Sequence, residues 1–506
     1  MGKIKSAILT AVIVAAIVVL AFFATVSYTV PGSDGVKKYN SFISSISLGG
    51  DLTGEAVAVL YPDGVISDED YKFGIPDDET SEKYEEYVEK YKNFGSVWVD
   101  KDVLVDDEDG QALKASVKHD AELLSKRLGE KGYSAYSVLV RDDLTIAVTV
   151  PTNYSYSDYN DSEYSKSENS ASDKQTLISD TITRLAYGGE LSLRNSEVGK
   201  SGYDNILTPI NADVTTYFKN FKTFSRGGTY AIRVNLTNDG AKLFEEISAS
   251  VSAATSDKAV GFFVGDNQLL ALTLEETVSG KSFYITVSNK QIAVDYATVL
   301  NSCINGDALA LNYGDANDID IIYTNAALGD NAAIFLFVSV LALIVAAIVY
   351  SAVRYRALGF VNAIVILIYS LVIVVALLLI NIQLTIAGAI FALAGLALLL
   401  GSNFVLFEKV RSETQKGKTM QSAIKSAYKS LLKGILELHI VLVAVSLIIA
   451  LVCVGELAAC GLIFFIGTIA SYILYWFTRF MWFVVSSTVR DKFAFCGFKR
   501  EELEDD

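Results

Sequence analysis

Histidine, cysteine and proline are scarce in this 506-residue chain, which contains 2, 4 and 5 of them respectively. Two histidines cannot form a metal site by themselves, and the cysteines follow neither a zinc-binding spacing nor a disulfide framework. No Ser-His-Asp, Cys-His or paired-carboxylate arrangement occurs at a recognisable spacing, and no glycine loop of the phosphate-binding kind is found. The sequence therefore predicts no enzyme active site, no cofactor and no metal.

Apolar residues, in contrast, are abundant and unevenly distributed. They make up 51% of the chain, and the mean hydropathy of +0.36 is too high for a purely soluble protein of this size. An uncharged run of roughly 20 residues is enough to cross ~30 Å of hydrocarbon. The sequence predicts six such spans, and those after residue 331 contain no proline. We place the spans at 6–28, 331–353, 359–380, 384–406, 435–455 and 457–486.

The first apolar run follows Lys3 and Lys5, so a signal peptide is an alternative for this segment. However, the run is longer than the apolar region of a usual signal peptide, and no A-x-A-like cleavage site follows it. An uncleaved membrane anchor is therefore favoured.

The formal net charge of −16 is divided between the two parts of the chain. Residues 30–330 contain about 48 Asp and Glu against about 26 Lys and Arg, whereas basic residues prevail in the short loops after residue 331. Because positive loops stay in the cytoplasm, this pattern predicts both termini inside and residues 30–330 outside the plasma membrane. So acidic a domain is also a poor candidate for binding nucleic acid.

The domain between the first two spans has an α+β pattern. The segment 47–60 is a glycine-rich entry followed by a strand-like alternation. With a helix ending at Lys131–Gly132 and two strands up to Pro151, it follows the order of a ferredoxin-like half. Further along, a strand precedes a helix with Thr237 or Asn238 as its N-cap.

The second part of this domain continues with a hairpin at 259–275 that turns at Gly265–Asp266. A helix at 289–304 and a return strand at 306–313 complete it. The fold class is thus a six-helix transmembrane bundle plus an α+β extracytoplasmic domain with a ferredoxin-like base and an inserted head. We expect the following domains: first transmembrane helix 1–29, base 30–151, head 152–305 with a mobile loop at 152–175, return to the base 306–330, five-helix region 331–490 and acidic cytoplasmic tail 491–506.

The chain contains, in this order, the segments SLGGDLTGE, KRLGEKG, VNLTNDGAKLFEEIS, INGDALALNY, RYRALG and NFVLFEKVRSETQKGK. Together these segments resemble motifs of the SecD family of bacterial protein-export membrane subunits, which belongs to the RND-type superfamily. The first segment is similar to the family's LGLDLRGG, which marks Gly49, Asp51 and Gly54 as a fold motif.

One departure from the family concerns the mechanism. The family's fourth span ends in GMAVDANVLIFER, and its aspartate, held to be part of a proton path, aligns with Gly401, while its asparagine is kept as Asn403. Glycine carries no proton, so proton transfer has either moved to another residue or been lost.

Glu437 and His439 are the candidates to replace this aspartate, because a desolvated carboxyl and an imidazole both titrate near neutrality. They lie two residues apart on one helix and so point to nearly opposite faces. The alternatives are that Glu437 reaches water at the membrane boundary, that His439 has no relay role, and that Asn403 is structural. The amphipathic segment 415–433 is expected to lie along the inner membrane surface or against a channel complex.

The resemblance implies an accessory subunit of the Sec translocase that assists export of unfolded preproteins, with coupling to the proton gradient as an open question. It also implies a SecF-like second subunit, the SecY, SecE and SecG channel and the translocating preprotein as partners. Three alternatives remain: a proton-independent scaffold of the translocon, an exporter of lipid or small molecules, and a receptor-like ectodomain on a membrane anchor. An exporter usually carries two large outer domains, and a receptor would not need five closely spaced spans.

Overall fold

The structure is a computed structural model, and it forms two compact units. The membrane unit comprises residues 1–54 and 325–506, and the sheet unit comprises residues 55–324. The residues that the structure describes are 3–29, 38–62, 76, 78, 80–90, 108–141, 144–152, 171–195, 205–207, 216–226, 229–253, 258–313, 319–329 and 331–488. Most of the predicted mobile loop and the whole predicted tail lie outside these residues.

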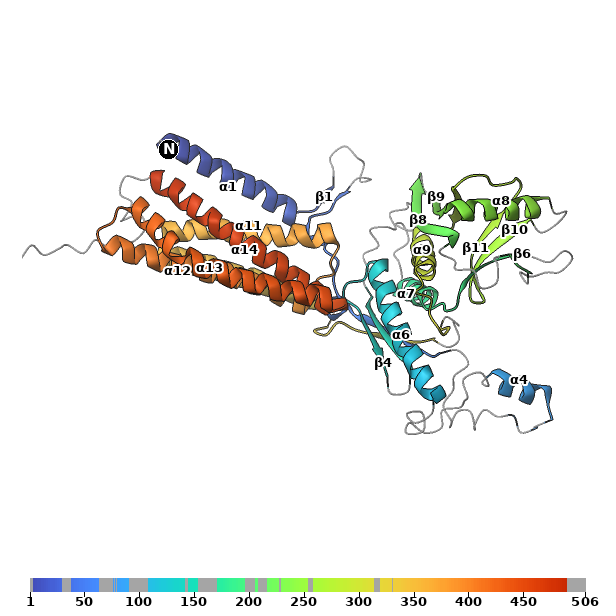
Figure 1. Cartoon of the computed structure of the whole chain (residues 1–506). Coiled ribbons are helices and arrows are strands. Elements are labelled where there is room, and N and C mark those ends of the chain that lie inside the picture. Colours follow the sequence, from blue (N-terminus) through green and yellow to red (C-terminus); the bar gives the residue numbers. More distant parts are fainter. Residues whose placement is uncertain are drawn as a thin grey trace, which may run out of the picture. The chain divides into compact units, whose positions relative to one another are not determined.

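Six long apolar helices, each able to cross a membrane by length and composition, form the membrane unit (Figure 1). They are α1 (Lys3–Thr25), α10 (Ala332–Tyr355), α11 (Ala357–Ile380), α12 (Ile386–Gln415), α13 (Met420–Val452) and α14 (Gly455–Thr488). Asn381 in the left-handed region ends α11, and the Thr385 hydroxyl accepts from Gly388 N to cap α12. The predicted bundle of six helices is therefore confirmed.

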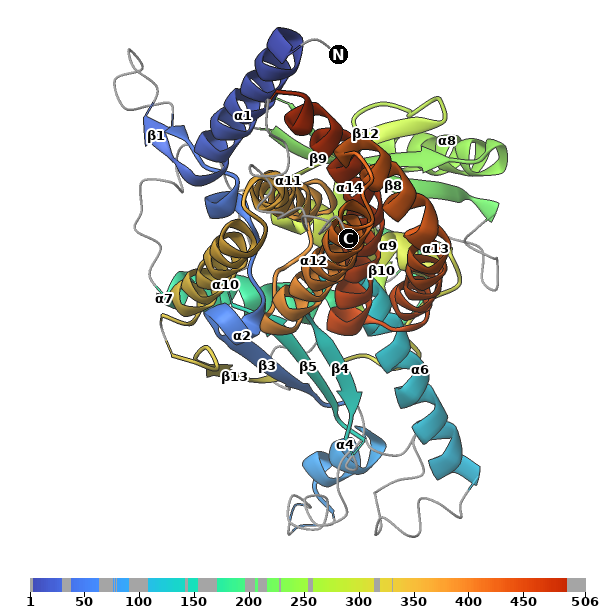
Figure 2. The same cartoon turned by 90° about the vertical axis from the view of Figure 1, so that its left-hand side faces the viewer.

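Helix α14 packs against α1, α11, α12 and α13, and α10 packs against α11 (Figure 2, end-on). Small residues bring the backbones together at one crossing: a Cβ on Gly395 of α12 would lie 3.2 Å from the backbone of Gly467 in α14. The same Cβ would meet the hydroxyl of Tyr369 in α11. Such small residues allow membrane helices to approach closely.

The amphipathic segment before the fifth span differs from its prediction. It is the first half of one continuous 33-residue helix, α13, and not a separate surface helix. Its apolar side chains Met420, Ile424 and Ala427 are buried in the core of the membrane unit. They pack onto neighbouring helices, because a face that is apolar enough for a membrane surface also suits a helix–helix contact.

Short elements complete the membrane unit. They are β1 (Tyr28–Thr29), which pairs with β2 (Lys38–Tyr39), the 3₁₀ helix η1 (Ile43–Ser45) and α2 (Gly50–Thr53).

The sheet unit contains the predicted ferredoxin-like base. Its four-stranded antiparallel sheet has the order β13-β3-β5-β4, and α6 connects β3 to β4. Four strands in this order with a helix crossover are what a ferredoxin-like topology requires, and the fourth strand returns only after the head. The elements are β3 (Glu55–Leu60), α4 (Glu82–Lys90), α6 (Glu108–Lys131), β4 (Ser137–Val140), β5 (Ile146–Pro151) and β13 (Ile319–Thr324).

The head is built on two further antiparallel sheets, ordered β11-β10-β6-β7 and β12-β9-β8. Thr237 caps α8 and Asn289 caps α9 through their side chains, and β10 and β11 form the predicted hairpin. The elements are α7 (Ala171–Leu185), β6 (Leu191–Asn195), β7 (Asn205–Ile206), β8 (Phe218–Arg226), β9 (Thr229–Leu236), α8 (Asn238–Ser252), β10 (Ala259–Val264), β11 (Asn267–Thr273), β12 (Ser282–Val287) and α9 (Lys290–Ile304).

The return strand predicted at 306–313 is not a strand. The carboxylate of Asp120 in α6 accepts hydrogen bonds from Ala310 N at 2.7 Å and Leu311 N at 3.0 Å, so these N–H groups are not available to a sheet. The alternating apolar side chains Leu309, Leu311 and Tyr313 are buried nonetheless. The strand that returns to the base is β13.

Candidate functional site in the membrane unit

The Gly-Gly-Asp segment at 49–51 is fixed to the start of α12. Gly49 N donates to Leu384 O, and Leu384 N donates to Ser47 O, both at 2.8 Å. These two bonds form a short parallel bridge between segments more than 300 residues apart in the chain. Gly54 adopts φ +96°, a conformation that favours glycine, and there α2 gives way to β3.

Asp51 holds the same helix through its side chain. Its Oδ2 accepts a hydrogen bond from Ile386 N, the first residue of α12, where a negative charge is favourable. Its Oδ1 is buried and has no hydrogen-bond partner among the described residues. Burial raises the pKa of Asp51; Glu456 adds to this, and the N–H donors oppose it. The predicted motif thus holds the N-terminus of α12 in place. Its partners, Leu384 and Ile386, could not be predicted from the sequence.

A chain of polar side chains crosses the interior of the membrane unit. Asn403 of α12 donates through Nδ2 to Oδ1 of Asn362 in α11, and Asn362 Nδ2 donates to Ser351 Oγ in α10, each at 2.8 Å. All three residues are fully buried. The sequence singled out Asn403 alone, although a lone asparagine within the apolar span of α11 could have signalled Asn362. Interhelical hydrogen bonds of this kind hold membrane helices together.

Gly401 lies two residues before Asn403 but on the outer face of α12. It is exposed, and a Cβ placed on it would meet no atom within 4 Å. Within the described part of the helices α10 to α14, Glu413 is the only carboxylate residue that is buried, and it contacts Lys416 and Lys418 near the α12–α13 loop. The interior formed by these described residues therefore has no acid beside Gly401.

Glu437 and His439 have very different surroundings. The Glu437 side chain is 63% exposed on the outside of α13, with Lys433 Nζ at 3.8 Å. His439 is buried, and its two ring nitrogens lie 2.7 Å from Ile435 O and from Ser471 Oγ of α14. Of the two, only the imidazole is in the interior with a polar partner on a neighbouring helix.

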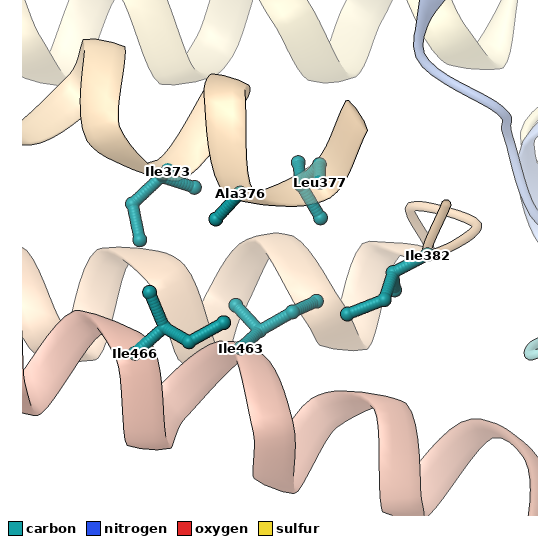
Figure 3. A pocket seen from close by; sticks show the side chains of 6 residues that line it. All are labelled: Ile373, Ala376, Leu377, Ile382, Ile463 and Ile466. Atoms are coloured by element: carbon teal, nitrogen blue, oxygen red, sulfur yellow. The ribbon is translucent and has the colours of Figure 1, made fainter. Parts of the chain in front are cut away.

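Between α11 and α14 lies a cavity of about 10 Å³, lined by apolar side chains alone (Figure 3). Ile373 and Leu377 face Ile463 and Ile466, and Ile382 closes one end. This is close to the smallest space that one water molecule occupies, and an apolar cavity stays dry. It therefore offers no path for a proton.

Comparison with known proteins finds a family that resembles most of the membrane unit. The family described as "Protein export membrane protein SecD/SecF, C-terminal" matches residues 307–485. This part of the chain is thus similar to SecD/SecF export proteins. The predicted resemblance, and the multi-pass membrane character, are thereby confirmed.

The individual relatives are distant from this chain. The protein translocase subunit SecD of Aquifex aeolicus (strain VF5) is 28% identical over 134 residues, 26% of each chain. SecD of Synechocystis sp. (strain ATCC 27184 / PCC 6803 / Kazusa) is 22% identical over 245 residues, 48% of each chain. The matched segments thus span about half or less of these relatives. A crystal structure of SecDF in its super-membrane-facing form covers 96% of this chain and 59% of that one, with 14% identity and a TM-score of 0.49.

Proposed function

We propose that this SecD-type chain assists protein export as one six-helix half of a larger assembly in a bacterial plasma membrane. The observation that carries the proposal is the SecD/SecF family match over residues 307–485, which coincides with the end of the sheet unit and five of the six spans. The ferredoxin-like base with its inserted head supplies a surface for an unfolded preprotein. The SecY, SecE and SecG channel is the partner that the family implies.

A second, SecF-like half would cover the exposed face of α12. This face bears Ile390, Ala394, Ala397, Gly401 and Val405, which are all exposed within the described membrane unit. Their spacing places them on one side of the helix. Three of the five are small, so a partner helix could approach closely.

We further propose that this half carries no proton-conducting acid. The outward, unoccupied Cβ direction of Gly401 and the exposed position of Glu437 support this proposal. The buried His439 is then the remaining titratable candidate in the interior. This favours the proton-independent scaffold as the second candidate function.

Depleting the chain from its cells and following pulse-labelled preproteins tests the export role. We expect precursors to accumulate, and re-expression of the chain to restore processing. Unchanged processing of several unrelated preproteins would overturn the proposal.

Inside-out membrane vesicles separate an energised role from a scaffold. We expect stimulation of import by the chain to survive a protonophore, and Glu437→Gln to match the parent. If the protonophore abolishes the stimulation and His439→Gln abolishes it too while Glu437→Gln does not, His439 is the relay. In either case, cysteine labelling of residues in the sheet unit from outside intact cells tests the predicted orientation.

A further inference from the structure

A large pocket lies where the beginning of α13 meets the last third of α14. Its volume is about 710 Å³, against about 10 Å³ for the apolar cavity between α11 and α14. The α13 side of the pocket bears Lys425, and the α14 side bears Arg479 together with an aromatic wall of Trp476, Phe480 and Phe483. All of these residues belong to the membrane unit, so the pocket does not depend on the placement of the sheet unit.

The two cations of this α13–α14 pocket have no carboxylate partner among the described residues. Their neighbours in the same region do: Lys416 and Lys418 lie at Glu413, and Lys433 lies at Glu437. The guanidinium of Arg479 instead stacks on Tyr428, 4.5 Å from its ring centroid. Two positive charges thus line one pocket, and the described part of the chain supplies no carboxylate that neutralises them.

The N-terminus of α13 opens into the same pocket. Thr419, the N-cap residue, makes no side-chain capping bond, whereas the caps of α8, α9 and α12 all do. The pocket is lined by Thr419, Gln421 and Ser422. The first N–H groups of any helix have no hydrogen-bond partner within that helix. An uncapped helix N-terminus favours an anion, above all a phosphate group.

Buried hydroxyl groups adjoin Arg479 as well. The Tyr428 and Tyr475 rings stack with centroids 5.2 Å apart, and both hydroxyl oxygens are buried without a hydrogen-bond partner among the described residues. The two tyrosines do not line the pocket themselves, but they fix the position of Arg479. The pocket lining therefore combines two cations without a carboxylate partner among the described residues and the first N–H groups of α13, and a phosphate group would satisfy such a set.

We propose that the α13–α14 pocket binds the head group of an anionic phospholipid. The phosphate lies against the N-terminus of α13 between Lys425 and Arg479, and the glycerol and upper acyl chains lie along the aromatic wall. A lipid is the occupant that fits, because α13 and α14 are both membrane-spanning helices. Trp476, Phe480 and Phe483 are exposed by 45, 48 and 43%, as expected of aromatic residues at a lipid interface.

Quenching of Trp476 fluorescence by brominated lipids tests this proposal on the full chain in nanodiscs. Brominated phosphatidylglycerol is titrated into a phosphatidylcholine bilayer, and brominated phosphatidylcholine is titrated in parallel. The signal from Trp476 is the difference between the parent and Trp476→Phe. We expect half-maximal quenching at a severalfold lower mole fraction of phosphatidylglycerol, and equal curves for the two lipids would overturn the proposal.

Charge variants locate the site. Lys425→Gln and Arg479→Gln should each weaken the preference for phosphatidylglycerol about fivefold, as the loss of one direct contact worth ~1 kcal/mol implies. Lys429→Gln removes the same charge one turn further along α13, outside the pocket, and should leave the preference unchanged. An equal effect of all three substitutions would show general surface attraction and would overturn the specific site.

Thr419→Asp separates binding from folding. An aspartate at the N-cap stabilises the helix and places a negative charge where the phosphate would bind. We expect a higher Tm together with loss of the phosphatidylglycerol preference; a retained preference would contradict the role of the helix N-terminus. Competition by millimolar glycerol phosphate as effective as that by lipid would instead assign the site to a soluble phosphate and overturn the lipid assignment. None of these outcomes depends on the proposed role in export.

Discussion

Asn403 Nδ2 donates a 2.8 Å hydrogen bond to Asn362 Oδ1, and this bond joins α12 to α11 inside the membrane unit. Asn362 donates in turn to Ser351 of α10, so one fully buried chain of side chains connects three of the six helices. In hydrocarbon an unpaired amide costs several kcal/mol, which makes the alternative arrangements of these helices unfavourable.

A double-mutant cycle on these two asparagines should reveal their coupling. We expect Asn403→Ala and Asn362→Ala each to lower the free energy of unfolding by about 1 kcal/mol, and the double variant to lose less than the sum. The measurement is reversible unfolding in mixed micelles. Strict additivity of the two losses would show that the hydrogen bond contributes nothing.

Two glycines of α12 should respond to alanine in opposite ways. A Cβ on Gly395 would lie 3.2 Å from the Gly467 backbone and would collide with the Tyr369 hydroxyl, which is itself bonded to Ala392 O at 2.8 Å. Gly395→Ala should therefore destabilise the chain by about 1–3 kcal/mol.

Gly401→Ala is the matched control, because its Cβ meets nothing within 4 Å. It should stabilise by about 0.4–1 kcal/mol through helix propensity. Tm values in detergent compare the two variants. A similar loss for both would mean that a further segment of the chain covers the outer face of α12.

The stability of the membrane unit should fall as pH rises through the acidic range because of Asp51. Burial raises the pKa of this carboxyl above 3.8, so the folded state binds a proton more tightly than the unfolded state does. Stability therefore decreases from the unfolded pKa up to the raised folded pKa and is constant above it. Asp51→Asn keeps an acceptor for Ile386 N and should remove this dependence, as followed by Tm between pH 3.5 and 7.

Glu456→Gln is the companion variant, since Glu456 adds to the rise in the pKa of Asp51. Glu456→Gln should narrow the pH range over which the stability changes, but it should not abolish the change. If Asp51→Asn retains the full pH dependence of the parent, another group is responsible.

Two lysines of α6 offer a contrast between a buried and an exposed ion pair. The Lys131 side chain is 4% exposed and pairs with the fully buried Asp295, to which Arg184 Nη1 also donates at 3.2 Å. Lys131→Met should cost about 3 kcal/mol, because a buried carboxylate loses its nearest counter-charge.

Lys126→Met removes the exposed pair with Asp307 and should cost at most about 1 kcal/mol. Chemical denaturation of the sheet unit within the full chain, followed by circular dichroism, distinguishes the two variants. Equal losses of unfolding free energy would show that burial does not strengthen the Lys131–Asp295 ion pair.

The sequence predicted those features that depend on local pattern. Long apolar runs predicted all six spans, and Thr237 and the Gly265–Asp266 turn were found where hydroxyl caps and tight turns belong. The start of α13 was missed because an amphipathic face does not tell whether lipid or another helix covers it. Segment 306–313 was misassigned because its alternation reports burial correctly, while its N–H groups bond to Asp120, far away in sequence.

The candidate sites depended on long-range partners, and the sequence could name only one member of each. It singled out Asn403 without Asn362, Asp51 without Ile386 and His439 without Ser471. The α13–α14 pocket was not predicted at all, because it requires two segments about 55 residues apart to meet.

The hydrogen bond between Asp51 and α12 also has a mechanical consequence. The chain crosses between its two units twice, at 54–55 and at 324–325, and the residues flanking these crossings are paired: Glu55 with Thr324, and Asp51 O with Ala327 N. Tension applied to the sheet unit would thus be carried by two paired segments of the chain and not by one. Asp51 also accepts a hydrogen bond from the first residue of α12, so part of the load would reach this helix, whose outer face is exposed at Ile390 and Val405.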